Sequence, residues 1–331
     1  MTWPEVSIIM TVVNEERHLA HAVEALLQQD YPGSFEIVVA VGPSHDHTRE
    51  VADELASRHP RVRVVDNPSG RTPSGLNAAI ARSTGTVVVR IDGHAMVPVD
   101  YVRVGVETLR TTGADNVGGI MAAEGTTPFE CAVARAMTSP FGVGGASFHI
   151  GGTAGPALTV YLGCFQRAAL ERVGGYDDTM IRAQDWEMNL RIRDTGGVVW
   201  FTPAMRVTYR PRPTSGALAR QYHDYGRWRR EVTRRYPDTL SLRYLAAPVM
   251  VVGVGFGCAV ALAGVLTHIA ALVTVGLLAP VGYLAADVLA STMAARREPS
   301  LSAGSALRMP WVFALMHVTW GVGFLRGRAK S

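Results

Sequence analysis

Three long stretches without a charged residue lie near the C-terminus, and they constrain the fold more than any other feature. Leu245–Leu266 is a run of 22 uncharged residues, and His268–Ala286 follows after a single threonine. Met309–Leu325 is the third stretch, bracketed by Arg308 and Arg326. At 1.5 Å per residue, the first stretch is long enough to cross roughly 30 Å of hydrocarbon as a helix. A buried helical bundle is the alternative, but this part of the chain offers almost nothing polar to cover one.

The net charge of +4 is an average over three unlike parts of the chain. Residues 1–205 carry a net charge of −7, residues 206–243 one of +7, and residues 244–331 one of +4. We therefore expect an acidic body over 1–205 and a basic segment over 206–243. A membrane region should follow over 244–331, with spans near 245–266, 268–286 and 309–325.

Cations beside the first two stretches indicate which side of the membrane they face. Arg243 precedes the first stretch, and Arg296 and Arg297 follow the second, which suits the cytoplasmic side. Three full crossings would place Arg326 outside, so whether the third stretch spans, re-enters or lies at the interface stays open. The first thirty residues show no signal-peptide pattern, and the three cysteines have no metal-ligand spacing. We expect a multi-pass protein of the inner or plasma membrane with a cytoplasmic body.

The basic segment carries the pattern of an amphipathic helix with aromatic residues. Leu218, Tyr222, Tyr225 and Val232 follow helical spacing, whereas most of the arginines point elsewhere. Such a helix directly before a membrane span is typical of the lipid headgroup region, so we expect anionic membrane lipid as a partner. A nucleic-acid partner is disfavoured because the body is acidic and a membrane anchor follows.

The body alternates short apolar runs with helical patterns. Runs rich in valine and isoleucine cover residues 6–12, 35–41, 62–65 and 87–91, and helical spacing lies between them. Continuous apolar strands separated by helices indicate an α/β fold with a mainly parallel sheet covered on both faces. Ligands of such sheets bind outside the carboxyl ends of the strands. We therefore look for chemistry in the residues that directly follow each run.

Asp92 and His94 form the most informative strand end. A buried strand that ends on aspartate is costly unless the carboxylate has a partner. The Asp-Gly-His spacing presents a carboxylate and an imidazole on the same side of an extended segment, and Gly93 leaves room for a phosphate. Phosphates and water would supply the remaining ligands of Mg²⁺ or Mn²⁺. We expect a divalent-metal site here; an aspartate that caps the following turn is the alternative.

Two further strand ends and one helix start carry weaker signals. Asn14-Glu15-Glu16 follows the first run and fits either a helix cap or a ligand site. The stretch 42–48, which contains Asp46, fits a nucleotide site or an ordinary turn. Asp185 lies in the first turn of a predicted helix, where the dipole favours a carboxylate even without function. It also suits a general base for a sugar hydroxyl.

In this order the motifs resemble those of the family 2 inverting glycosyltransferases of the GT-A fold. They are most similar to the membrane-bound exopolysaccharide branch typified by the succinoglycan glucosyltransferases. The resemblance covers roughly residues 5–245. Its motifs include Asn14-Glu15-Glu16, Gln29-Asp30-Tyr31-Pro32, Arg90-Ile91-Asp92-Gly93-His94, Ser139-Pro140-Phe141-Gly142, Gly174-Gly175-Tyr176-Asp177, Gln184-Asp185 and Arg220-Gln221-Tyr222. It implies a Rossmann-like GT-A catalytic domain followed by C-terminal transmembrane helices.

Carried onto the matching positions, the resemblance implies a role for several residues. Asp92 and His94 occupy the metal and diphosphate motif, and Asp185 occupies the position of the general base. The residues that would hold the donor nucleotide are Val12, Val13, Glu15, Asp46, Arg71, Asn77 and Asp92. Those that would lie near the acceptor or the diphosphate are Gln184, Gln221, Arg227 and Trp228.

The resemblance also implies a reaction. A hexose would pass from a nucleotide-diphosphate sugar, a UDP-sugar, to a polyprenyl-linked saccharide in exopolysaccharide synthesis, with Mg²⁺ or Mn²⁺ as cofactor. Val41 and Leu158 stand where the family usually has acidic residues, and the first of these touches the uracil or ribose, so the base stays open. Two alternatives remain. One is a polyprenyl-phosphate sugar synthase, and the other is a non-catalytic scaffold subunit of the same fold.

Overall fold

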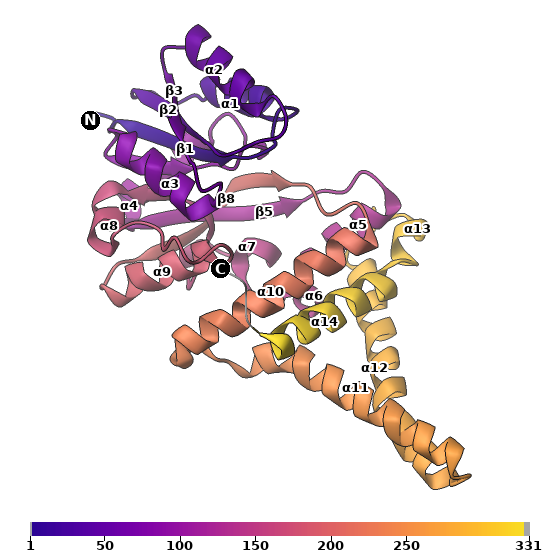
Figure 1. Ribbon diagram of the computed structural model, residues 1–331. Helices are drawn as coiled ribbons and strands as arrows, with labels where there is room; N and C mark the ends of the chain where they lie inside the picture. Colours follow the sequence, from indigo (N-terminus) through magenta and orange to yellow (C-terminus); the bar gives the residue numbers. More distant parts are fainter. Residues whose placement is uncertain (1, 328–331) are drawn as a thin grey trace. The chain divides into compact units, whose positions relative to one another are not determined.

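The computed structural model describes residues 2–327, which form two compact units (Figure 1). The first unit comprises residues 2–122 and 146–209, and the second comprises residues 123–145 and 210–327. Residues 123–145 therefore belong to the second unit, although the segments before and after them belong to the first. The boundary expected at residue 205 falls inside a strand that continues to Tyr209.

The first unit is an α/β unit in which a single sheet is covered by helices. Its strands are β1 (Val6–Val12), β2 (Phe35–Val41), β3 (Val62–Asp66), β4 (Val87–Arg90), β5 (Asn116–Ala123), β6 (Gly155–Pro156), β7 (Tyr161–Gln166) and β8 (Val199–Tyr209). Its helices are α1 (Leu19–Leu27), α2 (Thr48–Arg58), α3 (Thr72–Arg82), α4 (Tyr101–Thr112), α7 (Ser147–Ile150), α8 (Arg167–Val173) and α9 (Gln184–Asp194). The four apolar runs expected to form strands do so.

The sheet has the strand order β3-β2-β1-β4-β7-β5-β8-β6. Strands β3, β2, β1 and β4 pair in parallel, which confirms the expected α/β fold with its parallel sheet. Beyond β4 the sheet becomes mixed, because β7 runs antiparallel to both β4 and β5. The carboxyl ends of β1, β2 and β4 consequently lie along one edge of the sheet.

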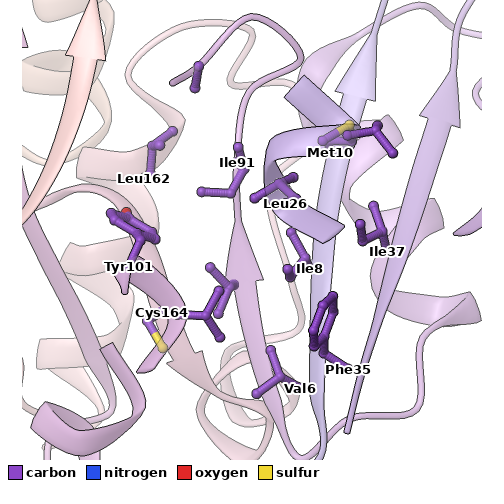
Figure 2. Close-up of a cluster of buried hydrophobic side chains, with 14 of the residues drawn as sticks. Val6, Ile8, Met10, Leu26, Phe35, Ile37, Ile91, Tyr101, Leu162 and Cys164 are labelled. Atoms are coloured by element: carbon purple, nitrogen blue, oxygen red, sulfur yellow. The ribbon is translucent and has the colours of Figure 1, made fainter. Parts of the chain in front are cut away.

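Alternating side chains of β1 supply two hydrophobic cores, one on each face of the sheet. Ile8 and Met10 point into a core completed by α1, α2 and α4 (Figure 2). Ile9 points into the other core, where α3, α8 and α9 pack. Burying a side chain of this size contributes roughly 1.5–3 kcal/mol. The two cores therefore fix the central strands that carry the candidate site.

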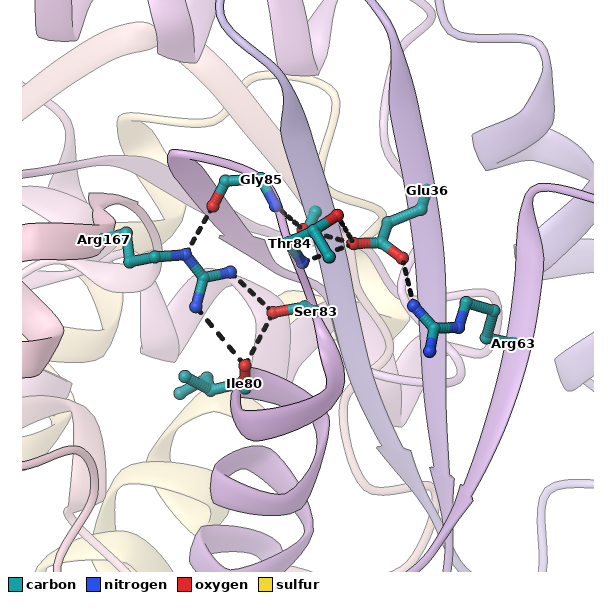
Figure 3. Close-up of polar contacts among 8 residues, drawn as sticks. Glu36, Arg63, Ile80, Ser83, Thr84, Gly85 and Arg167 are labelled. Carbon is teal, nitrogen blue, oxygen red and sulfur yellow. Dashed lines mark hydrogen bonds and ion pairs between the residues drawn. The ribbon is translucent and has the colours of Figure 1, made fainter.

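A polar network holds the turn that leads into β4 (Figure 3). Arg167 donates from Nε to the carbonyl of Gly85 at 2.6 Å and from Nη2 to the hydroxyl of Ser83 at 2.7 Å. The Glu36 carboxylate accepts from the backbone N–H of Thr84 at 2.7 Å. These bonds satisfy the polar groups of the turn and fix the start of β4, whose other end leads to the predicted metal motif.

The second unit is helical. Its elements are α5 (Pro128–Met137), α6 (Pro140–Val143), α10 (Ser215–Arg235), a 3₁₀ turn η1 (Pro237–Thr239), α11 (Leu242–Leu266), α12 (Ala270–Arg296), α13 (Ala303–Ala306) and α14 (Met309–Arg326). Helix α5 begins with a capping box, in which Thr127 and Glu130 each bond to the other's backbone N–H. Helices α11 and α12 pack on each other, and glycines at 257, 264 and 276 allow their backbones to approach closely.

Helices α11 and α12 are long and apolar enough to cross a membrane, with mean hydropathies of 2.4 and 1.8. Only 17% and 11% of their most apolar windows is buried, which is unlike the core helix of a soluble protein. Neither helix lies near the N-terminus, so neither is a signal sequence. The two helices indicate association with a membrane, and they overlap the first two uncharged stretches, although α12 continues past Ala286 to Arg296.

The third uncharged stretch forms α14. Within residues 2–327, only α11 and α12 meet the length and hydropathy expected of a span, and α14 does not. It packs along α10 instead. A Cβ added to Gly226 would lie 2.0 Å from the carbonyl oxygen of Trp320, and one added to Gly323 would lie 2.0 Å from that of His223. The two helix backbones are therefore in direct contact, while a crossing by α14 stays a prediction.

Helix α10 is the amphipathic helix that the basic segment predicts. Its buried side chains include Leu218, Tyr222, Trp228 and Val232. Protein covers this apolar face, chiefly α14, so the face is not available to lie on lipid as we expected. The residues 206–209, which we placed in the basic segment, belong to β8.

Candidate active site

The loops that follow β1 and β2 are joined by hydrogen bonds at the carboxyl edge of the sheet. The N–H of Asn14 donates to the Ser44 hydroxyl at 3.1 Å, and the N–H of Glu15 donates to the Thr48 hydroxyl at 2.7 Å. The N–H of His45 donates back to the Asn14 side chain at 2.8 Å. The two loops therefore form one structural element, and Asn14 adopts a left-handed backbone (φ 57°) to allow it.

Asp46, expected to contact the donor nucleotide, binds this loop pair. Its carboxylate accepts from the Thr48 hydroxyl at 2.5 Å, the Thr48 N–H at 3.1 Å and the Glu16 N–H at 3.2 Å. The hydroxyl of Thr48 is the main reason that the pKa of Asp46 is lowered. Asp46 thus shapes the edge of the candidate site, and a direct nucleotide contact stays a prediction.

Glu15 and His94 form a hydrogen bond across this edge. The Glu15 carboxylate lies 2.7 Å from Nδ1 of His94, which follows β4. Glu15, which the resemblance assigns to the nucleotide, therefore orients the imidazole assigned to the metal. A carboxylate on one ring nitrogen fixes the tautomer that presents the other nitrogen to a metal ion. Within the described residues, no three His, Cys, Asp or Glu side chains gather as a complete metal site.

Arg90, the last residue of β4, is the centre of the polar site. It is 3% exposed, and its Nη2 lies 3.1 Å from the Asp92 carboxylate. Its Nη1 forms an ion pair with Asp185 of α9. The two carboxylates hold the pKa of Arg90 well above its ordinary value, although burial alone would lower it. One buried guanidinium therefore joins the candidate metal aspartate to the candidate base.

Asp185 is held by two residues with unusual backbone conformations. Ala183, directly before α9, has φ 61°, and Leu162 of β7 has φ 59°. The backbone N–H of Leu162 lies close enough to the Asp185 carboxylate to favour its charged form and so to lower its pKa. The pairing of β5 with β7 shifts register between Val117 and Gly119, which leaves Leu162 in a bulge. A left-handed backbone conformation costs energy at residues other than glycine, such as Ala183 and Leu162. The backbone is therefore strained at the place where the fold positions this carboxylate.

Burial raises the pKa of Asp185 to about 6, because few polar groups solvate its charged form. The positive charge of Arg90 opposes this rise, and the negative charge of Asp92 adds to it. A carboxylate with a pKa near 6 is ionised at neutral pH and is a stronger base than an ordinary aspartate.

Buried polar contacts anchor α9, so that Asp185 is fixed in place. The Asn116 side chain of β5 donates to Asn189 at 2.6 Å, and Asn189 donates to the Thr159 hydroxyl at 3.0 Å. Glu187 is 1% exposed and binds Arg191 at 2.6 Å. These contacts join α9 to β5, to the loop before β7 and to itself, which limits its movement.

Residues 7–173 of the chain match the family described as Glycosyl transferase family 2, and this is half of the sequence. The chain belongs to this family. The glycosyltransferase is 30% identical to the succinoglycan biosynthesis protein ExoA of Rhizobium meliloti over 326 residues, which cover 96% of this chain and 93% of the relative. The resemblance seen in the motifs is thereby confirmed.

Two other proteins are similar to this glycosyltransferase. A dolichyl N-acetyl-alpha-D-glucosaminyl phosphate 3-beta-D-2,3-diacetamido-2,3-dideoxy-beta-D-glucuronosyltransferase of Methanococcus voltae is 25% identical over 67% of this chain and 71% of its own. The structure of a mannosyltransferase of Pyrobaculum calidifontis, in complex with GDP-Man and Mn²⁺, aligns with a TM-score of 0.59 and 20% identity. It covers 97% of this chain and 87% of its own, and it shows a shared fold.

The other donor residues predicted for the glycosyltransferase lie around the same sheet edge. Asn77 binds the chain at Tyr176 with its amide, donating to the carbonyl and accepting from the N–H, both at 2.8 Å. Arg71 precedes α3, and its carbonyl accepts from the Asn67 side chain at 3.1 Å. The side chain of Val12 is buried in the core, whereas Val13 is half-buried. Asn77 and Val12 are therefore engaged by the fold itself.

The predicted acceptor residues divide between the two units. Gln184 is the first residue of α9, next to the base. Gln221, Arg227 and Trp228 lie on α10 of the second unit. Gln221 donates to the Tyr225 hydroxyl at 2.8 Å, and Trp228 is 7% exposed. Their roles toward an acceptor stay predictions.

Sequence reasoning missed three contributions to the site of the glycosyltransferase. The role of Arg90 could have been predicted from the sequence, because an arginine at the end of an otherwise apolar buried strand requires a charged partner. Tyr176, whose ring lies 5.9 Å from the Arg90 guanidinium carbon, belongs to a recognised motif without an assigned role. The N–H of Leu162 had no signal, because a backbone bulge depends on strand pairing.

Proposed function

We propose that this glycosyltransferase transfers a hexose, with inversion at the anomeric carbon, from a nucleotide-diphosphate sugar to a polyprenyl-linked saccharide. UDP-sugars are the first donors to test. The Arg90-bound carboxylate of Asp185 at the start of α9 carries this proposal. The relatives named for succinoglycan biosynthesis and for a dolichyl-linked acceptor support a lipid-linked saccharide and a role in cell-surface polysaccharide synthesis. Helices α11 and α12 support action at a membrane. Our proposal places the catalytic unit at the cytoplasmic face of the cell membrane, with both helices crossing it.

In the proposed reaction, Asp185 accepts the proton of the acceptor hydroxyl as that oxygen attacks the anomeric carbon. The bond from the anomeric carbon to the phosphate oxygen breaks in the same displacement, and the nucleoside diphosphate leaves with the electron pair. Arg90 holds the carboxylate in one orientation, and the nearby N–H of Leu162 favours its charged form. A fixed orientation of the base removes the entropy cost of aligning it in the transition state.

Asp92 and His94 fit a divalent cation. The Asp92 side chain is 26% exposed and that of His94 is 53% exposed, so both are accessible to a ligand. The contact between His94 and Glu15 matches the carboxylate–histidine arrangement of metal sites. Mg²⁺ or Mn²⁺ bound there would neutralise charge on the diphosphate, and Mn²⁺ accepts imidazole more readily.

Calorimetric titration of the full-length protein with several nucleotide sugars, with and without Mn²⁺, tests the donor. We expect one nucleotide sugar to bind saturably and more tightly with the metal. A protein that binds none of them would be a scaffold subunit, and the proposed function would be wrong.

Asp185→Asn tests the base. We expect donor binding to persist and turnover to fall by about two orders of magnitude or more, the usual scale of general base catalysis. Asp194→Asn is the matched control, because it makes the same change at the exposed far end of α9 and should leave turnover unchanged. Near-normal turnover in Asp185→Asn would contradict the assignment. Because a phosphate acceptor needs little base catalysis, that result would favour a polyprenyl-phosphate sugar synthase.

A further inference from the structure

Two arginines of the second unit lie over the same aromatic ring. The guanidinium carbon of Arg229, on α10, lies 4.4 Å from the centre of the Tyr244 ring. That of Arg243, at the start of α11, lies 4.7 Å from the same point, and its Nη2 donates to the Tyr244 hydroxyl at 2.7 Å. Tyr244 thus gathers two cations from two different helices.

The distances to the shared ring limit how far apart the two cations can be. Since each lies within 5 Å of one ring centre, their guanidinium carbons are at most about 9 Å apart. A guanidinium that binds a phosphate through hydrogen bonds of about 2.8 Å lies roughly 4 Å from the phosphorus atom. Two arginines on one phosphate therefore lie at most about 8 Å apart, a separation that the limit set by the ring allows. Burial lowers the pKa of Arg229, and the charge of Arg243 lowers it further.

The carboxylates of α10 are engaged by other arginines. Glu231 accepts from Arg234 and Arg235, each at 2.7 Å. Asp224 lies 3.9 Å from Arg227. The fold has therefore brought Arg229 and Arg243 together while it uses the nearby acidic side chains elsewhere on the helix.

Apolar side chains surround the point where this cluster meets the first candidate span. Leu242, the first residue of α11, is 87% exposed, and Leu240 is 48% exposed. Exposed leucines beside two arginines at the start of a helix of mean hydropathy 2.4 match the boundary between headgroups and acyl chains. Water-soluble anions would gain nothing from these leucines, whereas a lipid would.

We propose that Arg229, Arg243 and Tyr244 form a binding site for the phosphate group of a membrane lipid, whose acyl or prenyl chain lies along Leu242 and α11. The phosphate accepts hydrogen bonds from both guanidinium groups. The site concerns attachment to lipid and does not depend on the proposed glycosyl transfer. It differs from a general attraction of basic residues to anionic membranes, because it requires two particular arginines on one ring.

The test uses the full-length protein in a non-ionic detergent, titrated with short-chain phosphatidic acid and followed by its thermal unfolding midpoint. A ligand that binds only the folded state raises this midpoint, and at a given concentration a tighter ligand raises it more. We expect saturable stabilisation by phosphatidic acid and much weaker effects of short-chain phosphatidylcholine and of inorganic phosphate. Arg229→Gln and Arg243→Gln should each weaken binding at least about tenfold. Arg243→Lys should weaken it less, because it keeps the charge and loses the planar fork.

Arg220→Gln is the matched control. It removes the same charge from the exposed side of the same helix, nine positions or roughly 14 Å away, and should leave binding unchanged. Arg243 is itself exposed, so its substitution should not disturb folding. Equal loss of binding in Arg220→Gln and Arg243→Gln would show a diffuse charge effect and overturn the proposal. Equal affinity for inorganic phosphate and phosphatidic acid would also overturn it, because the lipid would then add nothing.

Discussion

Arg90 binds Asp185 across 95 positions of the chain, and the same guanidinium binds Asp92. The contact joins β4, in the centre of the sheet, to the first turn of α9. It gives the candidate base a counter-ion in a region where burial otherwise disfavours charge. It also joins the base to the aspartate of the metal motif, because Asp185 and Asp92 share the Arg90 guanidinium as their counter-ion.

Arg90→Met should destabilise the fold. The change leaves two carboxylates without their shared cation, and removing one partner of a buried ion pair costs about 3 kcal/mol. Denaturation of the purified protein at pH 7 measures this loss. Arg58→Met is the control, because it breaks an exposed pair with Glu54 and should cost less than about 1 kcal/mol. A similar loss in both variants would contradict a buried role for Arg90.

Turnover should depend on pH through Asp185. Because its pKa is raised to about 6, the carboxylate is ionised above that pH and protonated below it. The value of kcat/KM should therefore rise between about pH 5 and pH 7 and then level off. Arg90→Lys should retain a profile near that of the parent protein, whereas Arg90→Met should move the midpoint upward. A midpoint near pH 4 in the parent would show that burial does not shift this group.

Asp185 should also make the stability of the fold depend on pH, in the opposite direction: its contribution should fall as the pH rises, whereas turnover rises. In the unfolded chain Asp185 loses its proton near pH 4, whereas in the folded chain it keeps the proton until about pH 6. Between these values the folded state binds more protons than the unfolded state, so this contribution to the free energy of unfolding falls as the pH rises. In Asp185→Asn this part of the pH dependence of stability should be absent.

The repeating apolar runs predicted the central sheet because burial on both faces imposes a local pattern. Val6–Val12 and Phe35–Val41 are strands with the expected bounds, and the motif Asp92-Gly93-His94 follows β4 at the expected edge. The antiparallel β7 was not expected, because the direction in which a strand pairs depends on residues distant in the chain.

The helical unit was harder to predict from composition. Residues 123–145 join it although they lie between two strands of the first unit, and nothing in their charge or hydropathy marks the change. The uncharged stretch that forms α14 satisfies the rule for a span about as well as for a buried helix. Helix α14 packs on α10 because Gly226 and Gly323 allow the two backbones to approach closely. A hydropathy pattern does not register this contribution of glycine.

Glu15→Gln should weaken divalent-metal binding without abolishing it. The amide would no longer attract the protonated nitrogen of His94 as strongly, and loss of such a partner typically costs about 10- to 100-fold in metal affinity. Titration with Mn²⁺ in the presence of the donor measures it. Glu16→Gln is the matched control, because its carboxylate binds His47 and not His94. Equal effects of the two variants would show that Glu15 does not act through His94.

Gly226→Ala should separate α10 from α14 and destabilise the helical unit. The added Cβ would lie 2.0 Å from the carbonyl oxygen of Trp320, which belongs to a backbone that cannot turn aside. Forcing an extra carbon into a packed contact costs typically about 1–3 kcal/mol, seen as a lower thermal midpoint of the protein in detergent. Gly216→Ala makes the same change at the start of α10, where a Cβ would come no closer than 3.7 Å to a neighbour, the flexible end of Arg220. It should be neutral or slightly stabilising, because alanine favours helix over glycine by about 1 kcal/mol. An unchanged midpoint in Gly226→Ala would mean that α14 does not pack on α10 in the membrane-bound protein.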